Sequence, residues 1–272
     1  MEEKLNNLKI GSFLNAKINQ DDVDDFVGNA IIVLPAGGES ARFKPVSGDD
    51  VQKSAFVLPN GETMIERTIS MYRDFGFKKF LVLLYHNGSS IEDLLKGDKY
   101  VDVSISYSYD PNRPVGRGGA VLNAYLKKMI SDDNHFIVHN PDDQLMGNQK
   151  ELLRKIIAYH ISHERKGAKA TAVVSLGAEY PYSALSVEDG VVTESATYPV
   201  IPIPTHTGMT VFSPSVLGDF KKLFNLENKT DFEPVLFPFL IKRKELFACP
   251  VGVDEWIAVN DEKGLKKLSR AL

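Results

Sequence analysis

The sequence predicts an α/β fold in which a mainly parallel sheet is followed by a more mixed, antiparallel half. In the first half, short apolar segments of strand type alternate with segments whose apolar residues recur at helical spacing. Parallel strands need crossover connections, so this alternation indicates a parallel sheet with helices on both faces. In the second half, strand-like segments follow one another through turn residues, which is typical of antiparallel pairing.

Periodicity places the elements of the parallel half. Residues 30–34 and 136–139 are continuous apolar runs of buried-strand type, whereas residues 101–109 are apolar at every second position. The expected strands are 30–34, 79–85, 101–109 and 136–139, and the expected helices are 62–75, 121–130 and 149–165. In such sheets, ligands bind at the carboxyl ends of the strands.

Turn signals place the elements of the second half. Residues 188–190, Glu-Asp-Gly, predict a hairpin turn. The expected strands are 169–176, 185–187, 191–193 and 207–212. The segment 198–206 is too rich in proline for a central strand and is expected to form a connecting loop or an edge.

Length and composition predict one large domain. At 272 residues the chain can bury a full core, and we expect a single domain over residues 30–272. Residues 1–29 have weak periodicity and end in an acidic stretch at 21–25, so we expect an N-terminal extension that packs loosely before the main fold.

Charge and cysteine content exclude several classes of function. The net charge of -4 disfavours nucleic-acid binding, which needs clustered Lys and Arg to release counterions. The single cysteine, Cys249, excludes an internal disulfide and a cysteine metal cage. The first residues resemble no signal peptide, and no apolar run of about 18 residues predicts a membrane span. We therefore expect a cytoplasmic protein without nucleic-acid or membrane partners.

A glycine pair ends the first predicted strand, in the segment VLPAGGESARFKP at residues 33–45. Gly37 and Gly38 would let backbone N–H groups close on a phosphate, and Arg42 and Lys44 would balance its charge. A tight turn with a solvated basic tip would explain the same residues. The segment is neither G-x-G-x-x-G nor a P-loop, which disfavours a Rossmann dehydrogenase and a P-loop NTPase.

Five segments, in the correct order over nearly all of residues 30–272, resemble the motifs of the sugar-1-phosphate nucleotidyltransferases. The first, LPAGGESARFKP, resembles the loop A-G-G-x-G-T-R-x-x-P, with Ser40 at the third glycine and Arg42 in register. The others are QKSAFVLPNGETMIERTISMYRDFG, PVGRGGAVLNA, FIVHNPDDQL and GMTVFSPSVL. The resemblance implies a Rossmann-like, GT-A-like fold with three layers, helix, sheet and helix.

The resemblance also implies a reaction. A phosphate oxygen of a sugar 1-phosphate attacks the α-phosphorus of a nucleoside triphosphate, which gives a nucleotide sugar and pyrophosphate, with Mg²⁺ as the cofactor. Both reactants are anionic, so positioning and charge neutralisation dominate catalysis, and the resemblance assigns these roles to Arg42 and Lys53. The residues implied to bind the nucleotide are Ala36, Gly37, Gly38, Asn112, Gly118 and Gly119. Many members of the family are oligomers, which leaves a homo-oligomer open.

Gly118 and Gly119 are expected just before a helix, and a plain helix N-terminus would explain them without a nucleotide.

The metal ligands implied by the resemblance are Asp142 and Asn260. Asp142 follows the strand at 136–139, and Asn260 lies in the segment Val-Asn-Asp near the C-terminus. Carboxylate and amide oxygens suit Mg²⁺, and Asp143 is the alternate. An Asx turn would explain the two aspartates equally well, and Asn260 would also serve as the N-cap of the last helix.

The acceptor site is the part that the resemblance covers least. The family has an E-K-P motif before its G-x-Y-x-F strand, but here that region contains Glu194 and no lysine. The candidates for this pocket are Asp143, Tyr182, Glu194 and Thr207, although packing explains Tyr182 equally well. His160 and His163 are expected on a polar helix face rather than in a metal site, and Trp256 is expected in the core.

Two other functions remain open on the sequence alone. A glycosyltransferase of the same fold would use the carboxylates of residues 141–144 to hold the metal of a nucleotide sugar. The glycine loop and Lys53 argue against it, because that donor lacks the reacting triphosphate. A non-catalytic regulator that binds nucleotide sugars is suggested by Ala258 at a family aspartate, by Pro141 in the metal motif and by the missing lysine.

Overall fold

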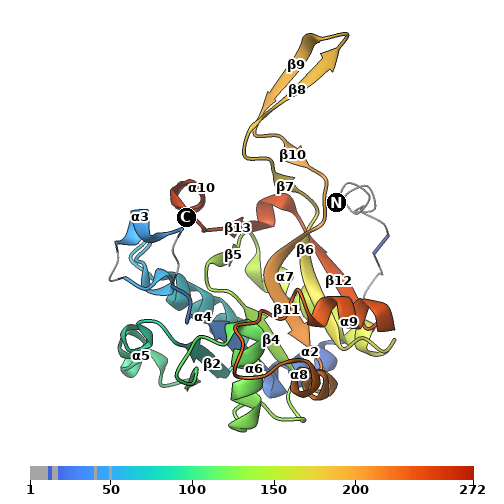
Figure 1. Ribbon diagram of the computed structural model, residues 1–272. Coiled ribbons are helices and arrows are strands. Elements are labelled where there is room, and N and C mark those ends of the chain that lie inside the picture. Colours follow the sequence, from blue (N-terminus) through green and yellow to red (C-terminus); the bar gives the residue numbers. More distant parts are fainter. Residues whose placement is uncertain (1–11, 14–17, 40–41, 49–50) are drawn as a thin grey trace.

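The centre of the molecule is a seven-stranded sheet of order β12-β6-β11-β4-β1-β2-β3 (Figure 1). It is seen in a computed structural model that describes residues 12–13, 18–39, 42–48 and 51–272. The strands are β1 (Ile31–Pro35), β2 (Lys79–Leu84), β3 (Ser104–Tyr109), β4 (Phe136–His139), β6 (Ala170–Ser175), β11 (Thr205–Phe212) and β12 (Leu246–Val251). In this sheet β11 runs antiparallel to β4 and β6, and the remaining neighbours pair in parallel. The predicted α/β class, parallel first and mixed later, is confirmed.

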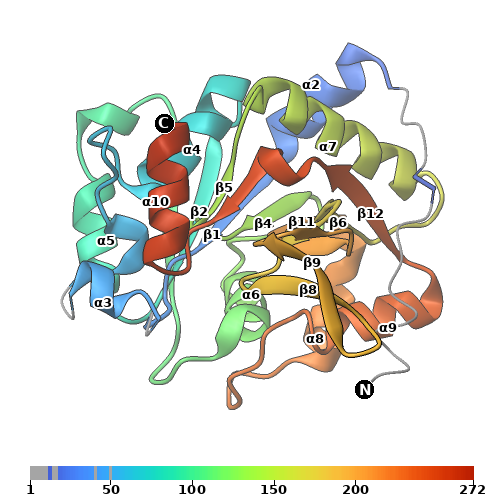
Figure 2. The ribbon, with the colours of Figure 1, turned by 90° about the horizontal axis from the view of Figure 1, so that it is seen from above.

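Helices cover both faces of this sheet, which gives the three layers seen from above in Figure 2. One face carries α2 (Gln20–Asn29), α4 (Met64–Phe75), α5 (Gly88–Leu95) and α7 (Gln149–Glu164), and the other carries α6 (Gly116–Leu126), α8 (Leu217–Leu223) and α9 (Leu236–Arg243). Side chains of a strand alternate between faces, so Ile32 and Leu34 join the first core, and Ile31 and Val33 join the second. The predicted buried strand thus supplies both layers of the core.

A third, smaller core draws distant segments together at the carboxyl edge of the sheet. It is built by side chains of α3 (Lys44–Ser47), β13 (Trp256–Ala258) and α10 (Glu262–Ala271), of the start of α4, and of the turns next to η1 (Lys53–Ala55) and β5 (Asp143–Leu145). Phe43, Met64, Ile257 and Leu268 are among its buried side chains. This packing brings the loop after β1, the segment after β4 and the C-terminal region to one place.

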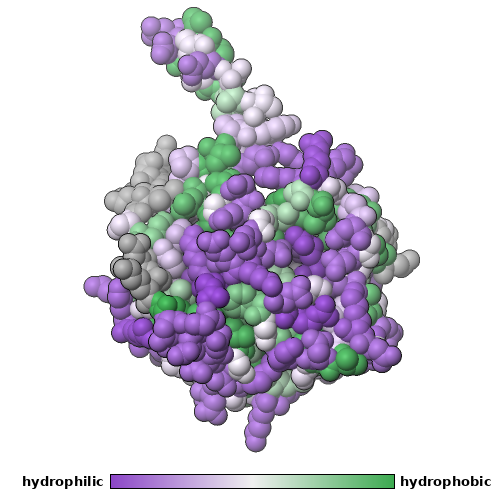
Figure 3. Space-filling view, turned by 180° about the vertical axis from the view of Figure 1, so that it is seen from behind, coloured by the Kyte–Doolittle hydropathy of each residue, from purple (hydrophilic) through white to green (hydrophobic). Residues whose placement is uncertain are grey.

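A long hairpin projects from the body. It consists of β8 (Ser183–Glu188) and β9 (Val191–Thr197), and the turn has positive φ at Asp189 and Gly190, as the predicted turn requires. Its base is β7 (Ala178–Glu179) paired with β10 (Val200–Ile201). We call residues 178–201 the arm. Its outer part, β8 and β9, stands clear of the body in Figures 1 and 3, whereas Glu179 and Tyr198 at its base contact Lys263 of α10. The proline-rich segment at 198–206 therefore contains the short strand β10 and the first two residues of β11.

Three expectations about local structure are wrong. Residues 20–29 form helix α2, in which Val23 and Phe26 are buried, so this part of the extension packs closely on the body. Residues 1–11 and 14–17 lie outside the described part of the chain. The helix expected at 121–130 begins at Gly116 and ends at Leu126, and Lys128 beyond it has a positive φ of 60°. His160 and His163 do not form a polar face, because both are buried.

The remaining short elements are η2 (Asp98–Tyr100), η3 (Pro214–Val216) and η4 (Val253–Glu255). Within the described residues, every helix is too short or too polar to cross a membrane.

Candidate active site

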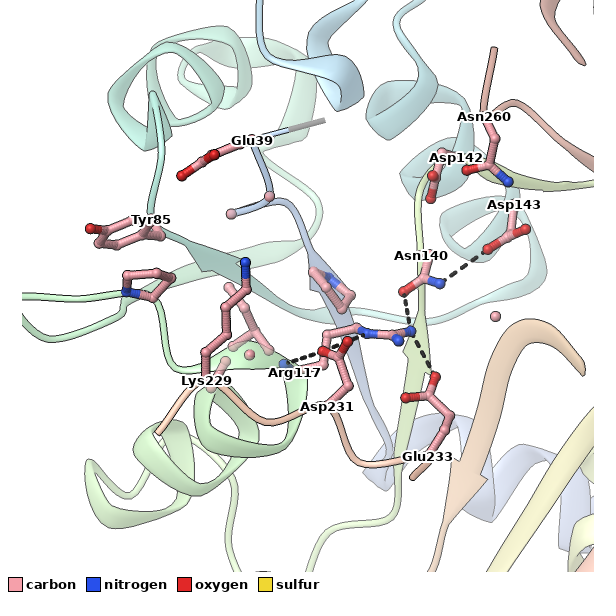
Figure 4. A pocket seen from close by; sticks show the side chains of 18 of the residues that line it. Glu39, Tyr85, Arg117, Asn140, Asp142, Asp143, Lys229, Asp231, Glu233 and Asn260 are labelled. Carbon is pink, nitrogen blue, oxygen red and sulfur yellow. Dashed lines mark hydrogen bonds and ion pairs between the residues drawn. The ribbon is translucent and has the colours of Figure 1, made fainter. Parts of the chain in front are cut away.

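A cavity of about 580 Å³ opens at the carboxyl edge of β1, β2 and β4 (Figure 4). Its walls are the loop after β1, the end of β2 with the start of α6, the segment after β4, and β13, and a loop before α9 completes it. The lining residues are Pro35, Gly37, Gly38, Glu39, Arg42, Leu83, Leu84, Tyr85, Asp110, Pro114, Gly116, Arg117, Ala120, Asn140, Asp142, Asp143, His206, Gly208, Lys229, Asp231, Glu233, Trp256, Ala258 and Asn260. This is the edge at which a ligand was expected, and the volume suits a small-molecule site.

Gly37 and Gly38 follow β1, and each is a glycine for a different structural reason. A Cβ on Gly37 would lie 2.8 Å from the backbone nitrogen of Tyr85, so a side chain there would force β1 and β2 apart. A Cβ on Gly38 would meet nothing within 4 Å, because this residue faces the open cavity. Ala36 is buried behind them and donates its N–H to Leu83 O at 2.8 Å. Gly37, Gly38 and Arg42 thus line the cavity as expected, whereas Ala36 is not among the lining residues.

Lys53 joins the two predicted metal ligands. Its Nζ donates to Asp142 Oδ2 at 2.5 Å and to Asn260 Oδ1 at 3.1 Å, although Asn260 is 207 residues away in the sequence. The lysine is buried, with 7% of its surface exposed, and belongs to η1. Asn260 is not the cap of the last helix, because Asp261 accepts from Gly264 N at 2.9 Å in that role.

The donor set at this point fits a hard cation. The oxygens of Asp142 and Asn260 converge on one positively charged group, which at present is the lysine ammonium. Mg²⁺ prefers such carboxylate and amide oxygens and usually keeps several waters, and the Asp142 side chain is 26% exposed toward the cavity. These two residues are therefore able to hold Mg²⁺ beside Lys53.

Asp143 has a different environment from Asp142. It is buried at the start of β5 and accepts from Asn140 Nδ2 and from Trp256 Nε1, both at 3.0 Å. Burial, followed by the charge of Asp142, raises the pKa of Asp143 to about 7. Trp256 is not in the core as expected, because it lines the cavity and holds this carboxyl group.

Gly208 explains why β11 can pass so close to Asp143. It has a φ of +72°, and a Cβ at this position would lie 2.0 Å from Asp143 Oδ2. The register of β11 against β6 shifts between His206 and Thr210, which is an irregularity of the kind that a glycine inside a strand signals. The glycine within the strand segment at 207–212 was the sequence signal for this close approach.

Arg117 forms an ion-pair cluster at the floor of the cavity (Figure 4). Its Nη1 is 2.7 Å from Glu233 Oε1 and donates to Asn140 Oδ1 at 3.4 Å, and its Nε donates to Asp231 Oδ1 at 3.3 Å. Burial alone would lower the pKa of Arg117, but the charges of Glu233 and Asp231 outweigh it and raise that pKa. Burial raises the pKa of Glu233 despite the neighbouring arginine.

Two more residues of the cavity were missed from the sequence. Lys229, from the loop before α9, points into the cavity (Figure 4). His206 lines it beside Glu233, with Nδ1 4.0 Å from Glu233 Oε1, and burial lowers its pKa to about 4, which keeps the imidazole neutral. The loop carrying Lys229, Asp231 and Glu233 has no periodicity or motif that would have marked it.

The structure does not bring every expected nucleotide-binding residue into the cavity. Gly118 and Gly119 lie inside α6, and a Cβ on them would come within 2.3 Å of Phe224 and 2.7 Å of Val115 respectively. They are glycines because of close packing, and Gly116, Arg117 and Ala120 face the cavity instead. Asn112 is exposed on the loop between β3 and α6, outside the cavity lining.

The expected acceptor residues, apart from Asp143, also lie elsewhere. Tyr182 is 66% exposed at the base of the arm, and Glu194 is exposed in β9 opposite Ser186. Thr207 is buried in β11, where its hydroxyl donates to Val173 O at 3.1 Å. The arm carries the first two away from the body, and strand alternation turns Thr207 away while His206 and Gly208 face the cavity.

Comparison with known proteins gives one family and one fold. The model of a family described as nucleotidyl transferase matches residues 30–259. HddC from Yersinia pseudotuberculosis is 21% identical with a TM-score of 0.61, over 89% of this chain and 98% of that one. A putative glucose-1-phosphate thymidylyltransferase from Bacillus anthracis is 15% identical with a TM-score of 0.65, over 89% of this chain and 96% of that one.

A UDP-glucose pyrophosphorylase from Acinetobacter baumanii is 17% identical with a TM-score of 0.64, over 89% of this chain and 92% of that one. At these identities the solved structures establish the fold. No curated protein sequence matches the chain.

Proposed function

The chain belongs to the nucleotidyl transferase family, and we propose that it joins a nucleoside triphosphate to a sugar 1-phosphate, or to a similar phosphorylated alcohol, with Mg²⁺ as cofactor. The products would be a nucleotide sugar and pyrophosphate. Structures of the same fold support this choice of substrates. A UDP-glucose pyrophosphorylase is complexed with UDP-glucose, and HddC is complexed with GMP-PN.

The observation that carries the proposal is the convergence of Lys53, Asp142 and Asn260 beside the cavity that Gly38 and Arg42 line. Transfer of a nucleotidyl group brings two anions together and needs no covalent nucleophile on the protein, so charge placement does most of the catalysis. This arrangement supplies cations, an open backbone loop and two hard oxygen donors around one space.

Each residue has a role in the proposed reaction. The backbone at Gly38 and the guanidinium of Arg42 would bind the triphosphate, and the Lys53 ammonium would neutralise charge at the α-phosphate. The attacking phosphate oxygen forms the new bond to the α-phosphorus as the bond to the β-phosphate oxygen breaks and pyrophosphate leaves. Asp142 and Asn260 would hold Mg²⁺, which when bound supplies further charge neutralisation at the phosphates.

Of the residues expected at the acceptor site, Asp143 lines the cavity, whereas Tyr182, Glu194 and Thr207 do not. We place the acceptor site near Asn140, His206 and Trp256, which line the same cavity. His206 stays neutral, so it can hydrogen-bond to a hydroxyl without adding charge. Lys229, which points into the cavity, would supply positive charge in place of the family lysine that this chain lacks.

The test is pyrophosphate release from a matrix of the common nucleoside triphosphates against sugar 1-phosphates and phosphocholine, with Mg²⁺ and with chelator. We expect release with one pair, lost with chelator and strongly reduced in Lys53→Met. Nucleotide-sugar binding without any release would favour the regulator. Sugar transfer from a nucleotide sugar, without pyrophosphate chemistry, would favour the glycosyltransferase.

A further inference from the structure

Three side chains with metal-binding atoms meet at the amino end of β4. His135 directly precedes this strand, and His160 and Glu164 lie one turn apart on the same side of α7. Their ligand atoms all lie within 4.8 Å of one another, and His135 Nε2 is 3.0 Å from both carboxylate oxygens of Glu164. The candidate active site begins at Asn140, beyond the other end of β4, so this cluster is separate from it.

Hydrogen bonds orient His160 toward the cluster. Its Nδ1 is 3.0 Å from Thr171 Oγ1, and the same hydroxyl lies 3.2 Å from His163 Nδ1. If Nδ1 of His160 donates to the hydroxyl and the hydroxyl donates to His163, the lone pair of His160 Nε2 faces the cluster. There its hydrogen bond to Ser213 Oγ is long, at 3.4 Å. A hydrogen-bond partner on the ring nitrogen that faces away from the metal typically fixes the orientation of a metal-binding histidine.

The surroundings of the cluster differ on its two sides. On the inner side, Phe26 of α2 packs on the rings of His135 and His160, with centroids 5.0 and 5.9 Å away. On the outer side, the side chains of His135 and Glu164 are 24% and 36% exposed, which gives an ion a way in. The cluster is therefore covered by an aromatic ring on one side and accessible to an ion from the other.

We propose that this cluster binds Zn²⁺ through His135 Nε2, His160 Nε2 and a carboxylate oxygen of Glu164, with Ser213 Oγ or water as the fourth ligand. Two histidines and one glutamate form a known zinc donor set, and tetrahedral zinc with bonds of about 2.0–2.2 Å holds its ligand atoms about 3.4 Å apart. The separations in the structure, 3.0 Å between His135 and Glu164 and at most 4.8 Å within the cluster, lie on both sides of that spacing. The ion would tie α7 to β4 and, through Phe26, hold α2 on the body.

The test measures zinc content and needs no enzyme activity. The chain is stripped with chelator and reloaded with Zn²⁺ in excess Mg²⁺, and the metal that stays bound after gel filtration is counted. Co²⁺ loading then reports tetrahedral geometry by its visible absorption. The variants are His135→Gln and Glu164→Gln at the cluster, Asp142→Asn at the candidate active site, and Glu151→Gln at the exposed start of α7 as the matched control.

We expect one equivalent of Zn²⁺ in the wild type, in Glu151→Gln and in Asp142→Asn, with a raised Tm in each. His135→Gln and Glu164→Gln should lose the ion and the rise in Tm while keeping the wild-type circular dichroism. Wild-type protein that retains no zinc, or His135→Gln that retains as much as wild type, would overturn the proposal. The cluster would then be only the His135–Glu164 ion pair.

Discussion

Replacing Lys53 with Met removes the positive charge shared by Asp142 and Asn260 while keeping a side chain of similar length. Met still packs near Phe43, whose ring lies 5.4 Å from the Lys53 ammonium. Losing one charged donor at the reacting phosphates is expected to cost about 10²–10³ in kcat. The half-saturating Mg²⁺ concentration should fall, because the ammonium no longer occupies the oxygens of Asp142 and Asn260.

The free energy of unfolding of Lys53→Met should remain high enough to keep the protein folded, so the loss of activity is not a loss of structure. The variant leaves the Asp142 carboxylate without its partner at 2.5 Å, but that side chain is 26% exposed and can regain water. We expect a loss of about 1–3 kcal/mol in the free energy of unfolding, which leaves a typical domain folded. Urea titration by circular dichroism measures this term, and pyrophosphate release measures kcat/KM.

Lys78→Met is the matched control, because Lys78 is 59% exposed and pairs only at the surface with Asp102 at 3.3 Å. Such a pair contributes about 0–1 kcal/mol, so activity and stability should stay near wild type. The reasoning fails if folded Lys53→Met keeps kcat/KM within tenfold of wild type. An unchanged Mg²⁺ dependence would separately show that lysine and metal do not share these oxygens.

Three further predictions concern the cavity walls. Gly208→Ala places a side chain at positive φ and against Asp143, so we expect a loss of about 1–3 kcal/mol in the free energy of unfolding. The control is Gly218→Ala in α8, where a Cβ would meet nothing within 4 Å, and it should be neutral or stabilising. Arg117→Met leaves the half-buried carboxylate of Glu233 without its arginine and should cost about 1–3 kcal/mol, because water can reach a side chain that is 21% exposed. The double variant with Glu233→Gln should recover part of this loss, and no recovery would contradict the ion pair. The pKa of His206 is lowered to about 4 by burial, from about 6.5 in the unfolded chain, so its contribution to stability is complete above pH 6.5 and is lost as the pH falls toward 4. Between pH 7.5 and 5 this amounts to about 2 kcal/mol, and His206→Gln should lower the pH-dependent loss seen in urea titrations by that amount. The rest should come from His139, His160 and His163, whose pKa values burial also lowers, and an unchanged slope would assign all of it to these groups.

The fold could be predicted from the sequence wherever one physical signal dominated. Strand β4 (Phe136–His139) was placed to the residue because a short apolar run bounded by polar residues admits few alternatives. The hairpin turn at Asp189 and Gly190 was found because these residues tolerate positive φ. Helix α6 was misplaced because Gly118 and Gly119 were interpreted as loop residues. They lie in the helix to make room for Phe224 and Val115, which only the tertiary structure shows.

The candidate site could be predicted where its residues follow strands of the parallel sheet or where a motif marks them, as for Lys53 and Asn260. Gly38, Arg42 and Asp142 lie in the cavity because the carboxyl ends of β1 and β4 meet at one edge. Lys229 and Glu233 come from a loop without periodicity, and packing of α8 and α9 decides where that loop lies. Tyr182 and Glu194 were expected near the acceptor, but the length of the arm carries them away, and no local pattern reveals the direction in which a hairpin projects.

The charges that line the cavity explain why the proposed function rests on Lys53, Asp142 and Asn260 rather than on the glycine loop. Among the described residues, the lining contains six carboxyl groups and three cations, namely Glu39, Asp110, Asp142, Asp143, Asp231 and Glu233 against Arg42, Arg117 and Lys229. Arg117 is already paired with two of these acids, and burial moves Asp110, Asp143 and Glu233 toward their neutral forms by raising each pKa. A triphosphate and a phosphomonoester add several negative charges, more than Arg42 and Lys229 can offset. In the proposed reaction the remaining positive charge would come from Lys53 and from Mg²⁺ held by Asp142 and Asn260, whose oxygens converge.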